Sequence, residues 1–280
     1  MIILRTLFFA LLLLLSANVS SQIVLDTPNT ESVLYLGSSE NQPLVVGLGG
    51  SEGGNAWTAD YWKTTRDQFV TNGYAFLAVG YFGAKGTPAI LDKIAIEDVH
   101  NAIVSAASHP KVNPAKIAIV GGSRGADLAL ILASYYNDIH CVVGLAASHA
   151  IFPGHTDHFT SSCWTFQNKE LPFVPVNEAA VPFLIKGDLR KTFETMLTDT
   201  VEEEKALIPV EKINGPVLLI SATADEICPS TPMSEKIMVR LKSKKFSHHS
   251  EHIAIEGSHA EPMKHFDLVF RFLKKHFVAM

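Results

Sequence analysis

The chain has 280 residues, of which 47% are hydrophobic, and a formal net charge of −5 at neutral pH. This mild acidity, without a basic stripe, argues against binding to nucleic acid or to an anionic membrane surface. No internal repeat or abrupt change of composition divides the chain, and its length suits one large domain with a substantial core.

The N-terminal residues resemble a targeting segment. One basic residue, Arg5, precedes an apolar run over residues 7–15, and small polar residues follow over 17–21. The run is shorter than the roughly 20 residues that a membrane-spanning helix needs. We therefore predict a signal peptide over residues 1–21 and export to the periplasm or the medium, with no stable membrane anchor after cleavage. An uncleaved N-terminal helix is the alternative.

Residues 22–280 alternate between strand-like and helix-like patterns. Strands are expected at 23–36 (a short pair), 43–47, 74–80, 117–121, 141–146, 216–221 and 252–256, and helices at 59–71, 94–107, 126–133, within 191–207 and at 261–277. The first helix offers Tyr61, Trp62, Phe69 and Val70 for a buried face. Alternation of this kind predicts an α/β fold with a mostly parallel central sheet and helices on both faces.

One strand runs directly into a glycine-rich turn around Ser123. Gly121 and Gly125 stand two residues before and after this serine, and their missing side chains permit a turn tight enough to lift the hydroxyl clear of the sheet. G-x-S-x-G between a strand and a helix is the nucleophile elbow of the α/β-hydrolase fold. A serine nucleophile also requires a histidine that takes its proton and a carboxylate that orients the histidine.

In this fold the carboxylate follows the serine along the chain and precedes the histidine. Asp225 lies just beyond the strand at 216–221, and we choose it over Glu226 because a shorter side chain holds an imidazole more rigidly. Asp188 and Asp199 are weaker candidates because they lie in a less regular region. The sequence therefore predicts Asp225 as the orienting acid.

The histidine is expected where the last strand ends. His259 follows a glycine turn after the strand at 252–256, whereas His252 lies within that strand and His265 lies within the expected final helix. Three residue types thus occur in the required order at three strand exits. We predict a catalytic triad of Ser123, Asp225 and His259.

A glycine-rich loop over residues 48–54 follows the strand at 43–47. Its exposed backbone N–H groups suit an oxyanion hole, for which we name the N–H groups of Gly50 and of Arg124, the residue after the nucleophile. Tyr81 and Phe82 begin another loop at the same sheet edge. They are either packing residues or substrate contacts, and we include them as candidate substrate-binding residues.

Residues 148–214 interrupt the alternation and are expected to form a cap-like insertion over the site. The group His149, His155, Asp157 and His158 has no standard zinc-ligand spacing, so we predict no metal, and nothing in the sequence requires a cofactor.

Three cysteines are an odd number for an exported chain. Cys141 opens an apolar strand and is expected to be a small buried residue. A Cys163–Cys228 bridge is compatible with an oxidising compartment, although the sequence favours free thiols.

With these residues in place, the sequence resembles the C-terminal catalytic domain shared by acyl-CoA thioester hydrolases and bile acid-CoA:amino acid N-acyltransferases. The resemblance covers nearly all of residues 22–280. It is carried by YFG at 81–83 with Pro88, GSRGADL at 122–128, LPFVPVN at 171–177, IPVEK at 208–212 and GSH at 257–259 with Pro262.

The resemblance implies the same roles for Ser123, Asp225 and His259, and hydrolysis of an acyl thioester or ester through an acyl-enzyme. The amino-acid-conjugating branch of the family uses a cysteine nucleophile, so a serine favours water as the acceptor. The chain departs from the family in three respects. It has no room for the N-terminal β-sandwich domain of longer members, and Cys228 replaces an expected aromatic residue. It also carries a predicted export signal, although coenzyme A is expected inside cells.

The expected partner is therefore a small-molecule acyl thioester or ester. An exported carboxylesterase similar to dienelactone hydrolases would use the same triad and is the alternative. An acyltransferase or a peptidase is less favoured, and a non-catalytic binding module least, because all three triad residue types are present. The sequence predicts no oligomeric state.

Overall fold

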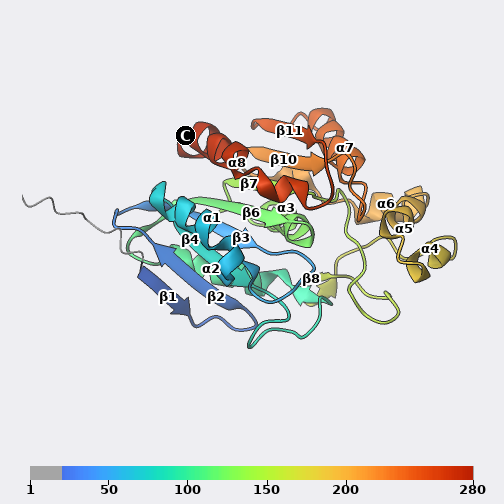
Figure 1. Cartoon of the computed structure of the whole chain (residues 1–280), viewed down its shortest axis with the longest axis horizontal. Coiled ribbons are helices and arrows are strands. Elements are labelled where there is room, and N and C mark those ends of the chain that lie inside the picture. The colour runs from blue at the N-terminus through green and yellow to red at the C-terminus, as the bar shows by residue number, and fades with distance from the viewer. Residues whose placement is uncertain (1–20, 280) are drawn as a thin grey trace, which may run out of the picture.

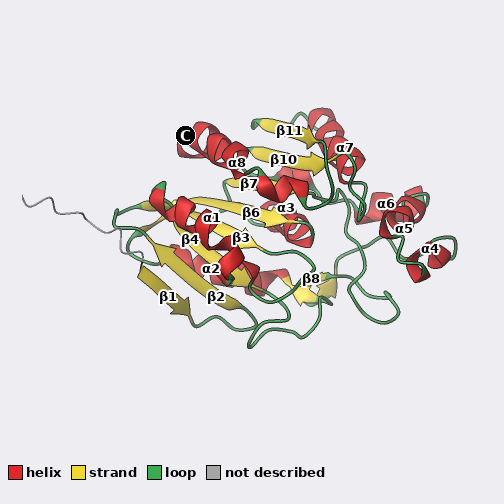
Figure 2. Ribbon diagram, viewed as in Figure 1, coloured by secondary structure: helices red, strands yellow, loops and turns green. Residues whose placement is uncertain are grey.

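The computed structural model describes residues 21–279, so all but the last residue of the predicted signal peptide lies outside the described residues. Eight strands form the central sheet in the order β1-β2-β4-β3-β6-β7-β10-β11 (Figures 1 and 2). The pairs β1–β2 and β2–β4 are antiparallel, and every other pair is parallel. The strands are β1 Ser21–Leu25, β2 Glu31–Leu36, β3 Gln42–Leu48, β4 Ala75–Gly80, β6 Val112–Gly122, β7 Cys141–Leu145, β10 Val217–Ala222 and β11 Ser250–Ile255.

Helices cover both faces of this sheet, which confirms the predicted architecture. The larger helices are α1 Asp60–Thr71, α2 Ile96–Ala107, α3 Arg124–Tyr135, α7 Ser230–Ser243 and α8 Phe266–Leu273. Apolar residues of α1 and α8 share one buried cluster, whereas those of α2, α3 and α7 share the other. Figure 1 shows α1 and α8 on the near face. Because both faces are covered, strands such as β4 and β7 are apolar and buried along their whole length.

Helix α1 buries a narrower face than the sequence predicts. Phe69 is fully buried, and Trp62 and Val70 are partly buried against the same cluster. Tyr61, which we expected to be buried, is 79% exposed. A helix presents only one stripe of side chains to a flat sheet, and Tyr61 lies outside this stripe.

The C-terminal helix is also shorter than predicted. Residues Glu261–Lys264 form a 3-10 turn, His265 leaves helical geometry with φ −104° and ψ 48°, and α8 begins at Phe266. The last residues, Lys274–Val278, form a π-helical turn. The N–H of His265 donates to the carbonyl oxygen of Pro262, three residues earlier, and so closes the 3-10 turn before α8 begins.

Helix α7 is not among the elements that the sequence predicts. Its buried apolar residues, Met233, Ile237 and Leu241, recur every four residues, but the neighbouring apolar residues Met238 and Val239 are only partly buried and exposed, respectively. This single row of buried residues is a weak helical pattern in the sequence. The structure shows its role, because the helix packs against β10 and β11.

Residues 148–214 carry a separate group of short elements beyond one end of the sheet (Figure 1). These are α4 Val181–Ile185, α5 Leu189–Met196, α6 Thr200–Ala206, and the strands β8 Trp164–Phe166 and β9 Lys169–Glu170, which form a small sheet with β5 Ile94–Ala95. Their buried side chains, Phe152 and Met196 among them, form a cluster distinct from the two beside the central sheet. We refer to residues 148–214 as the cap.

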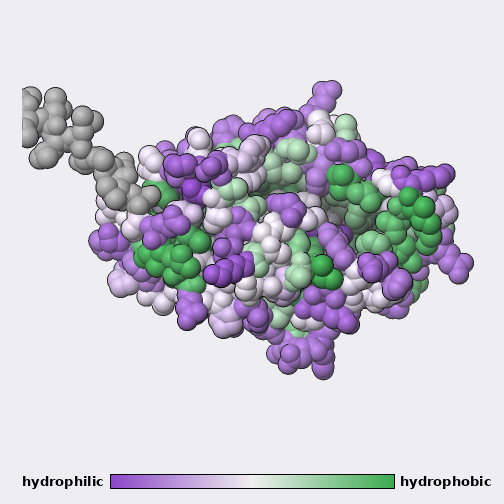
Figure 3. All heavy atoms as spheres, turned by 60° about the horizontal axis from the view of Figure 1, so that its bottom comes forward, coloured by the Kyte–Doolittle hydropathy of each residue, from purple (hydrophilic) through white to green (hydrophobic). Residues whose placement is uncertain are grey.

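The cap also exposes apolar surface. In Figure 3, hydrophobic residues gather at the end of the molecule that carries α4, where Ile185 is 80% exposed and Val181 39%. Within residues 21–279, every helix is too short or too polar to cross a lipid bilayer.

Candidate active site

Ser123 occupies the turn between β6 and α3 in a strained conformation. Its φ of 53° and ψ of −122° lie in a region that residues other than glycine rarely adopt. The flanking glycines make the turn possible. A Cβ at Gly121 would lie 2.0 Å from the carbonyl oxygen of Gly125, and a Cβ at Gly125 would lie 2.3 Å from the carbonyl oxygen of Gly49. The geometry is that of a nucleophile elbow.

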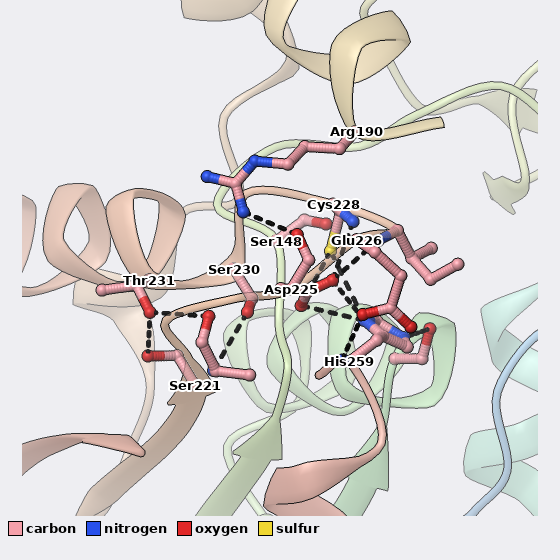
Figure 4. Close-up of polar contacts among 12 residues, drawn as sticks. Ser148, Arg190, Ser221, Asp225, Glu226, Cys228, Ser230, Thr231 and His259 are labelled. Carbon is pink, nitrogen blue, oxygen red and sulfur yellow. Dashed lines mark hydrogen bonds and ion pairs between the residues drawn. The ribbon is translucent and has the colours of Figure 1, made fainter. Parts of the chain in front are cut away.

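The structure brings the three predicted triad residues together. The Oγ of Ser123 lies 3.0 Å from the Nε2 of His259, and the Nδ1 of His259 lies 2.9 Å from each carboxylate oxygen of Asp225 (Figure 4). With a proton on Nδ1, the imidazole donates to Asp225 and leaves Nε2 free to accept from the serine hydroxyl. The arrangement suits proton transfer from Ser123 to His259.

Asp225 is fully buried at the end of β10. Burial alone would raise the pKa of its carboxyl group, but hydrogen bonds from His259, Ser230 and the backbone N–H of Cys228 outweigh burial and hold the pKa below its ordinary value. Its Oδ1 accepts the N–H groups of Ile227 and Cys228, each at 3.0 Å. Asp225 is therefore an anion that is held in one orientation by its own loop.

Two further residues fix the loops that carry Asp225 and His259. The Oε2 of Glu226 accepts the backbone N–H of His259 at 2.9 Å, so this glutamate joins the two loops instead of orienting the imidazole. From α5 in the cap, Arg190 donates through Nη1 to the carbonyl oxygen of Asp225 at 2.6 Å (Figure 4). The sequence gives no indication of either contact, because each joins segments that are distant along the chain.

The other acid and histidine candidates have different local roles. Asp188 and Asp199 cap the N-termini of α5 and α6 by accepting the backbone N–H groups three residues further along. His252 lies 2.7 Å from the Oγ of Ser221, and His265 lies 3.3 Å from Glu261. None of these four residues lines the cavity at Ser123.

The two predicted oxyanion donors both lie next to Ser123. Arg124 is the first residue of α3, where a backbone N–H has no intrahelical acceptor. Gly50 lies so close to Ser123 that a Cβ on the glycine would be 3.0 Å from the Cβ of the serine. The N–H of Gly50, however, donates to the Oε1 of Glu52 at 3.1 Å. One of the two donors is thus engaged by a carboxylate.

Tyr81 and Phe82 lie beneath the loop at residues 48–54 and do not line the cavity at Ser123. Tyr81 is 2% exposed, and its hydroxyl donates to the carbonyl oxygen of Gly49 at 2.6 Å. The ring of Phe82 lies 2.9 Å from where a Cβ on Gly53 would be. This geometry corrects the expected substrate contact: Tyr81 holds the loop at residues 48–54 in place, and Phe82 packs beneath it.

A cavity of about 450 Å³ opens at Ser123 and His259 between the sheet edge and the cap. The cap contributes mainly apolar side chains to its wall, including Val176, Leu184, Leu189, Phe193 and Met196. A smaller pocket of about 230 Å³ opens on the other side of Ser123 and is lined by Trp57, Trp62 and Phe266 among others. A larger groove of about 730 Å³ between α6 and α7 does not reach Ser123.

The three cysteines are free, so the Cys163–Cys228 bridge that the sequence left open is not formed. The thiol of Cys163 donates to the carbonyl oxygen of Pro153 at 3.1 Å, and burial raises its pKa to about 11. Cys228 lies beside the triad, with its Sγ 3.8 Å from Asp225 and 4.0 Å from the Nδ1 of His259. It occupies the position where the family resemblance implies an aromatic residue.

The histidine-rich group in the cap does not converge on one point. His149 bonds Glu203 at 2.6 Å, whereas Asp157 and His158 are exposed. His155 lines the cavity, and burial together with the nearby Arg124 guanidinium lowers its pKa to about 4. Over residues 21–279, the His, Cys, Asp and Glu groupings compact enough for a metal ion are Asp225–Cys228–His259 and His249–Glu251–His276, and neither includes a member of this histidine group.

Comparison with known proteins gives one family. The profile described as BAAT / Acyl-CoA thioester hydrolase C terminal matches residues 94–260. Similar proteins include the acyl-coenzyme A amino acid N-acyltransferase 1 of Mus musculus, 25% identical over 175 residues, and the acyl-coenzyme A thioesterase 6 of Homo sapiens, 28% identical over 176 residues. These matches cover 62% and 61% of this chain, but only 39% of the length of each relative.

Solved structures agree on the fold. The uncomplexed acylaminoacyl peptidase of Pyrococcus horikoshii superposes with a TM-score of 0.65 at 14% identity, covering 92% of this chain and 41% of that one. An esterase of Pyrococcus furiosus superposes with a TM-score of 0.57 at 14% identity, covering 93% and 94%. These similarities establish an α/β-hydrolase fold.

Proposed function

Since the chain belongs to the BAAT / acyl-CoA thioester hydrolase C-terminal family, we propose that it is a serine hydrolase that cleaves acyl thioesters and transfers the acyl group to water. The observation that carries this proposal is the hydrogen-bonded series from Ser123 through His259 to Asp225 at the mouth of a mainly apolar cavity. Such a series activates a hydroxyl that is otherwise a poor nucleophile at neutral pH.

In the first half of the reaction, the Oγ of Ser123 attacks the thioester carbonyl and its proton passes to the Nε2 of His259. The buried carboxylate of Asp225 stabilises the imidazolium that forms. The carbonyl oxygen becomes an oxyanion, which accepts the N–H of Arg124 and, once Glu52 releases it, the N–H of Gly50. The C–S bond then breaks, His259 returns the proton to the leaving thiolate, and the acyl group remains on Ser123.

In the second half, water replaces the thiol. His259 removes a proton from a water molecule, the resulting hydroxide attacks the acyl-enzyme, and the acid leaves as Ser123 recovers its proton. Relatives named as acyl-coenzyme A thioesterases support a CoA thioester as the substrate, and the apolar lining from α4 and α5 suits an acyl chain. The nucleophile here is a serine, which favours water over an amino acid as the acceptor.

The decisive assay compares the chain lacking residues 1–21 with its Ser123→Ala variant on acyl-CoA thioesters and aryl esters of matched chain length. Loss of the nucleophile should lower kcat by several orders of magnitude. Serine-dependent turnover that strongly favours the CoA thioesters supports the proposal. Serine-dependent turnover of esters without preference for CoA favours the alternative, an exported carboxylesterase similar to dienelactone hydrolases. Equal rates for the two proteins would contradict a serine mechanism of either kind.

We further propose that residues 1–21 direct export. The observation behind this is the short apolar run after Arg5, followed by small residues up to Ser21. Expression of the full chain followed by mass spectrometry of the exported fraction should give a mature N-terminus near residue 22. Recovery of the intact N-terminus from a membrane fraction would instead support an uncleaved helix.

A further inference from the structure

Glu52 holds a position beside the nucleophile that the proposed mechanism does not use. Its Oε1 accepts the N–H of Gly50 at 3.1 Å. A Cβ placed on Gly50 would lie 2.9 Å from the Oε2 of Glu52 and 3.0 Å from the Cβ of Ser123. The carboxylate and the nucleophile therefore flank the same glycine. Glu52 also lines both the cap cavity and the smaller aromatic pocket, which meet at Ser123.

The charge of Glu52 is not balanced by a neighbour. Among residues 21–279, no lysine, arginine or histidine forms an ion pair with it. The cation of the cap cavity, Arg124, is paired with Asp127 at 3.2 Å, and the cation of the smaller pocket, Lys264, is paired with Glu261 at 2.8 Å.

The remaining titratable side chains of the cavity do not offset this charge. The pKa of His155 is lowered to about 4, first by burial and then by Arg124, so this histidine is neutral at pH 7. Cys228 is a buried thiol whose pKa is raised well above its ordinary value, chiefly by burial, so it is also neutral. Asp225 is buried behind His259 and is hydrogen-bonded to it. The space in front of Ser123 therefore carries an uncompensated negative charge from Glu52.

We propose that Glu52 is a specificity-determining residue that favours acyl groups carrying a positive charge a few bonds from the scissile carbonyl and disfavours acyl groups carrying a negative charge there. This inference rests on the proposed function, because it concerns the acyl group that Ser123 attacks. The carboxylate of Glu52 accepts the N–H of Gly50. When the substrate carbonyl oxygen approaches this N–H, the acyl carbons next to the carbonyl therefore lie close to that carboxylate.

The contact with Gly50 gives the charge a second effect. A carboxylate that accepts the N–H of Gly50 occupies an oxyanion donor, and it must leave before the tetrahedral intermediate can use that donor. Glu52 is exposed, so its carboxylate can exchange the contact with Gly50 for contacts with water or substrate. A cationic group on the substrate draws the carboxylate away from Gly50 and so exposes the donor. A neutral acyl group offers no such attraction, and an anionic one adds repulsion.

The test uses three acyl groups on one thiol leaving group: 4-(trimethylammonio)butanoyl, its neutral isostere 5,5-dimethylhexanoyl, and the anionic glutaryl group. The first two have nearly the same shape and differ in charge, so the ratio of their kcat/KM values isolates electrostatics. For a solvent-exposed carboxylate we expect the wild type to favour the cation over the isostere by about fivefold to tenfold, or about 1 to 1.4 kcal/mol. The glutaryl thioester should be the slowest of the three.

The Glu52→Gln variant keeps the shape of the side chain and removes its charge. We expect the ratio of cation to isostere to fall to within about twofold in this variant. The matched control is Glu40→Gln, which removes the same charge from the turn between β2 and β3, where Glu40 pairs loosely with Lys111. This control should keep the wild-type ratio, and the wild-type preference should weaken as salt is added.

A wild-type ratio near one, or a ratio that Glu52→Gln leaves unchanged, would overturn the inference. The Ser123→Ala variant separates this failure from failure of the proposed function. Serine-dependent turnover without a charge preference refutes only the role of Glu52. Turnover that does not depend on Ser123 refutes both.

Discussion

The hydroxyl of Tyr81 should control turnover without contacting the substrate. It donates to the carbonyl oxygen of Gly49 at 2.6 Å, and the next residue, Gly50, carries a predicted oxyanion donor. Tyr81→Phe removes this hydroxyl and leaves a partly buried backbone carbonyl without its partner. Loss of one partner of a buried hydrogen bond costs about 1 to 3 kcal/mol. For a domain of this size, that corresponds to a fall in Tm of about 2 to 10 °C.

The kinetic effect follows from the place of Gly49 in the fold. Its carbonyl oxygen also lies against Gly125, where an added Cβ would be only 2.3 Å away, so the loop and the elbow are in direct contact. Complete loss of one oxyanion donor costs about 10² to 10³ in kcat. A loosened donor should cost less, and we expect a fall of about tenfold. KM should change little, because Tyr81 does not line the cavity.

The assay is steady-state kinetics on one acyl thioester, together with thermal unfolding. Tyr74→Phe is the matched control, since Tyr74 is also buried but its hydroxyl has no hydrogen-bond partner among the described residues. A Tyr81→Phe variant with unchanged kcat and a raised KM would refute this reasoning, because it would identify Tyr81 as a substrate contact.

Three more substitutions test the site. Asp225→Asn should lower kcat about 10⁴-fold, because an amide cannot hold the His259 tautomer that accepts a proton from Ser123. Pre-steady-state kinetics should show slow acylation. A loss of kcat below tenfold would count against the triad. Gly125→Ala places a methyl group 2.3 Å from the carbonyl oxygen of Gly49 and should therefore reduce both soluble yield and kcat. A variant with wild-type Tm and activity would contradict this close contact. The pKa of His155 is lowered to about 4 in the folded state, so the unfolded state binds more protons between pH 6.5 and 4. The free energy of unfolding should therefore fall as the pH falls through this window. Denaturant titrations should show a flatter pH dependence for His155→Gln.

Most of the central fold could be predicted from sequence because its elements are locally encoded. The buried strands β4, β7 and β10 are short apolar runs between turn residues, and a parallel sheet covered on both faces requires this pattern. Helix α7 could not be predicted because its row of buried apolar residues is narrow. The exposure of Tyr61 could not be predicted either, because helical periodicity alone does not determine which side chains the sheet will cover.

The candidate triad could be predicted from sequence alone. Ser123, Asp225 and His259 each follow a strand of the same sheet, and parallel strands bring their carboxyl ends to one edge, so order along the chain was enough to predict their convergence. The side-chain distances agree with that expectation.

The surroundings of the candidate triad, by contrast, depend on contacts that form only in the folded chain. Three hydrogen bonds join segments that are between 32 and 35 residues apart: Tyr81 to Gly49, the backbone of His259 to Glu226, and Arg190 to Asp225. No local pattern encodes such contacts, because they depend on how loops and the cap pack against the sheet. The same holds for Glu52, whose side chain engages Gly50 only in the conformation that the folded loop adopts. The sequence specifies the reacting groups through their place on regular elements, whereas the cavity wall, the loop contacts and the charge beside the nucleophile arise from packing between irregular segments.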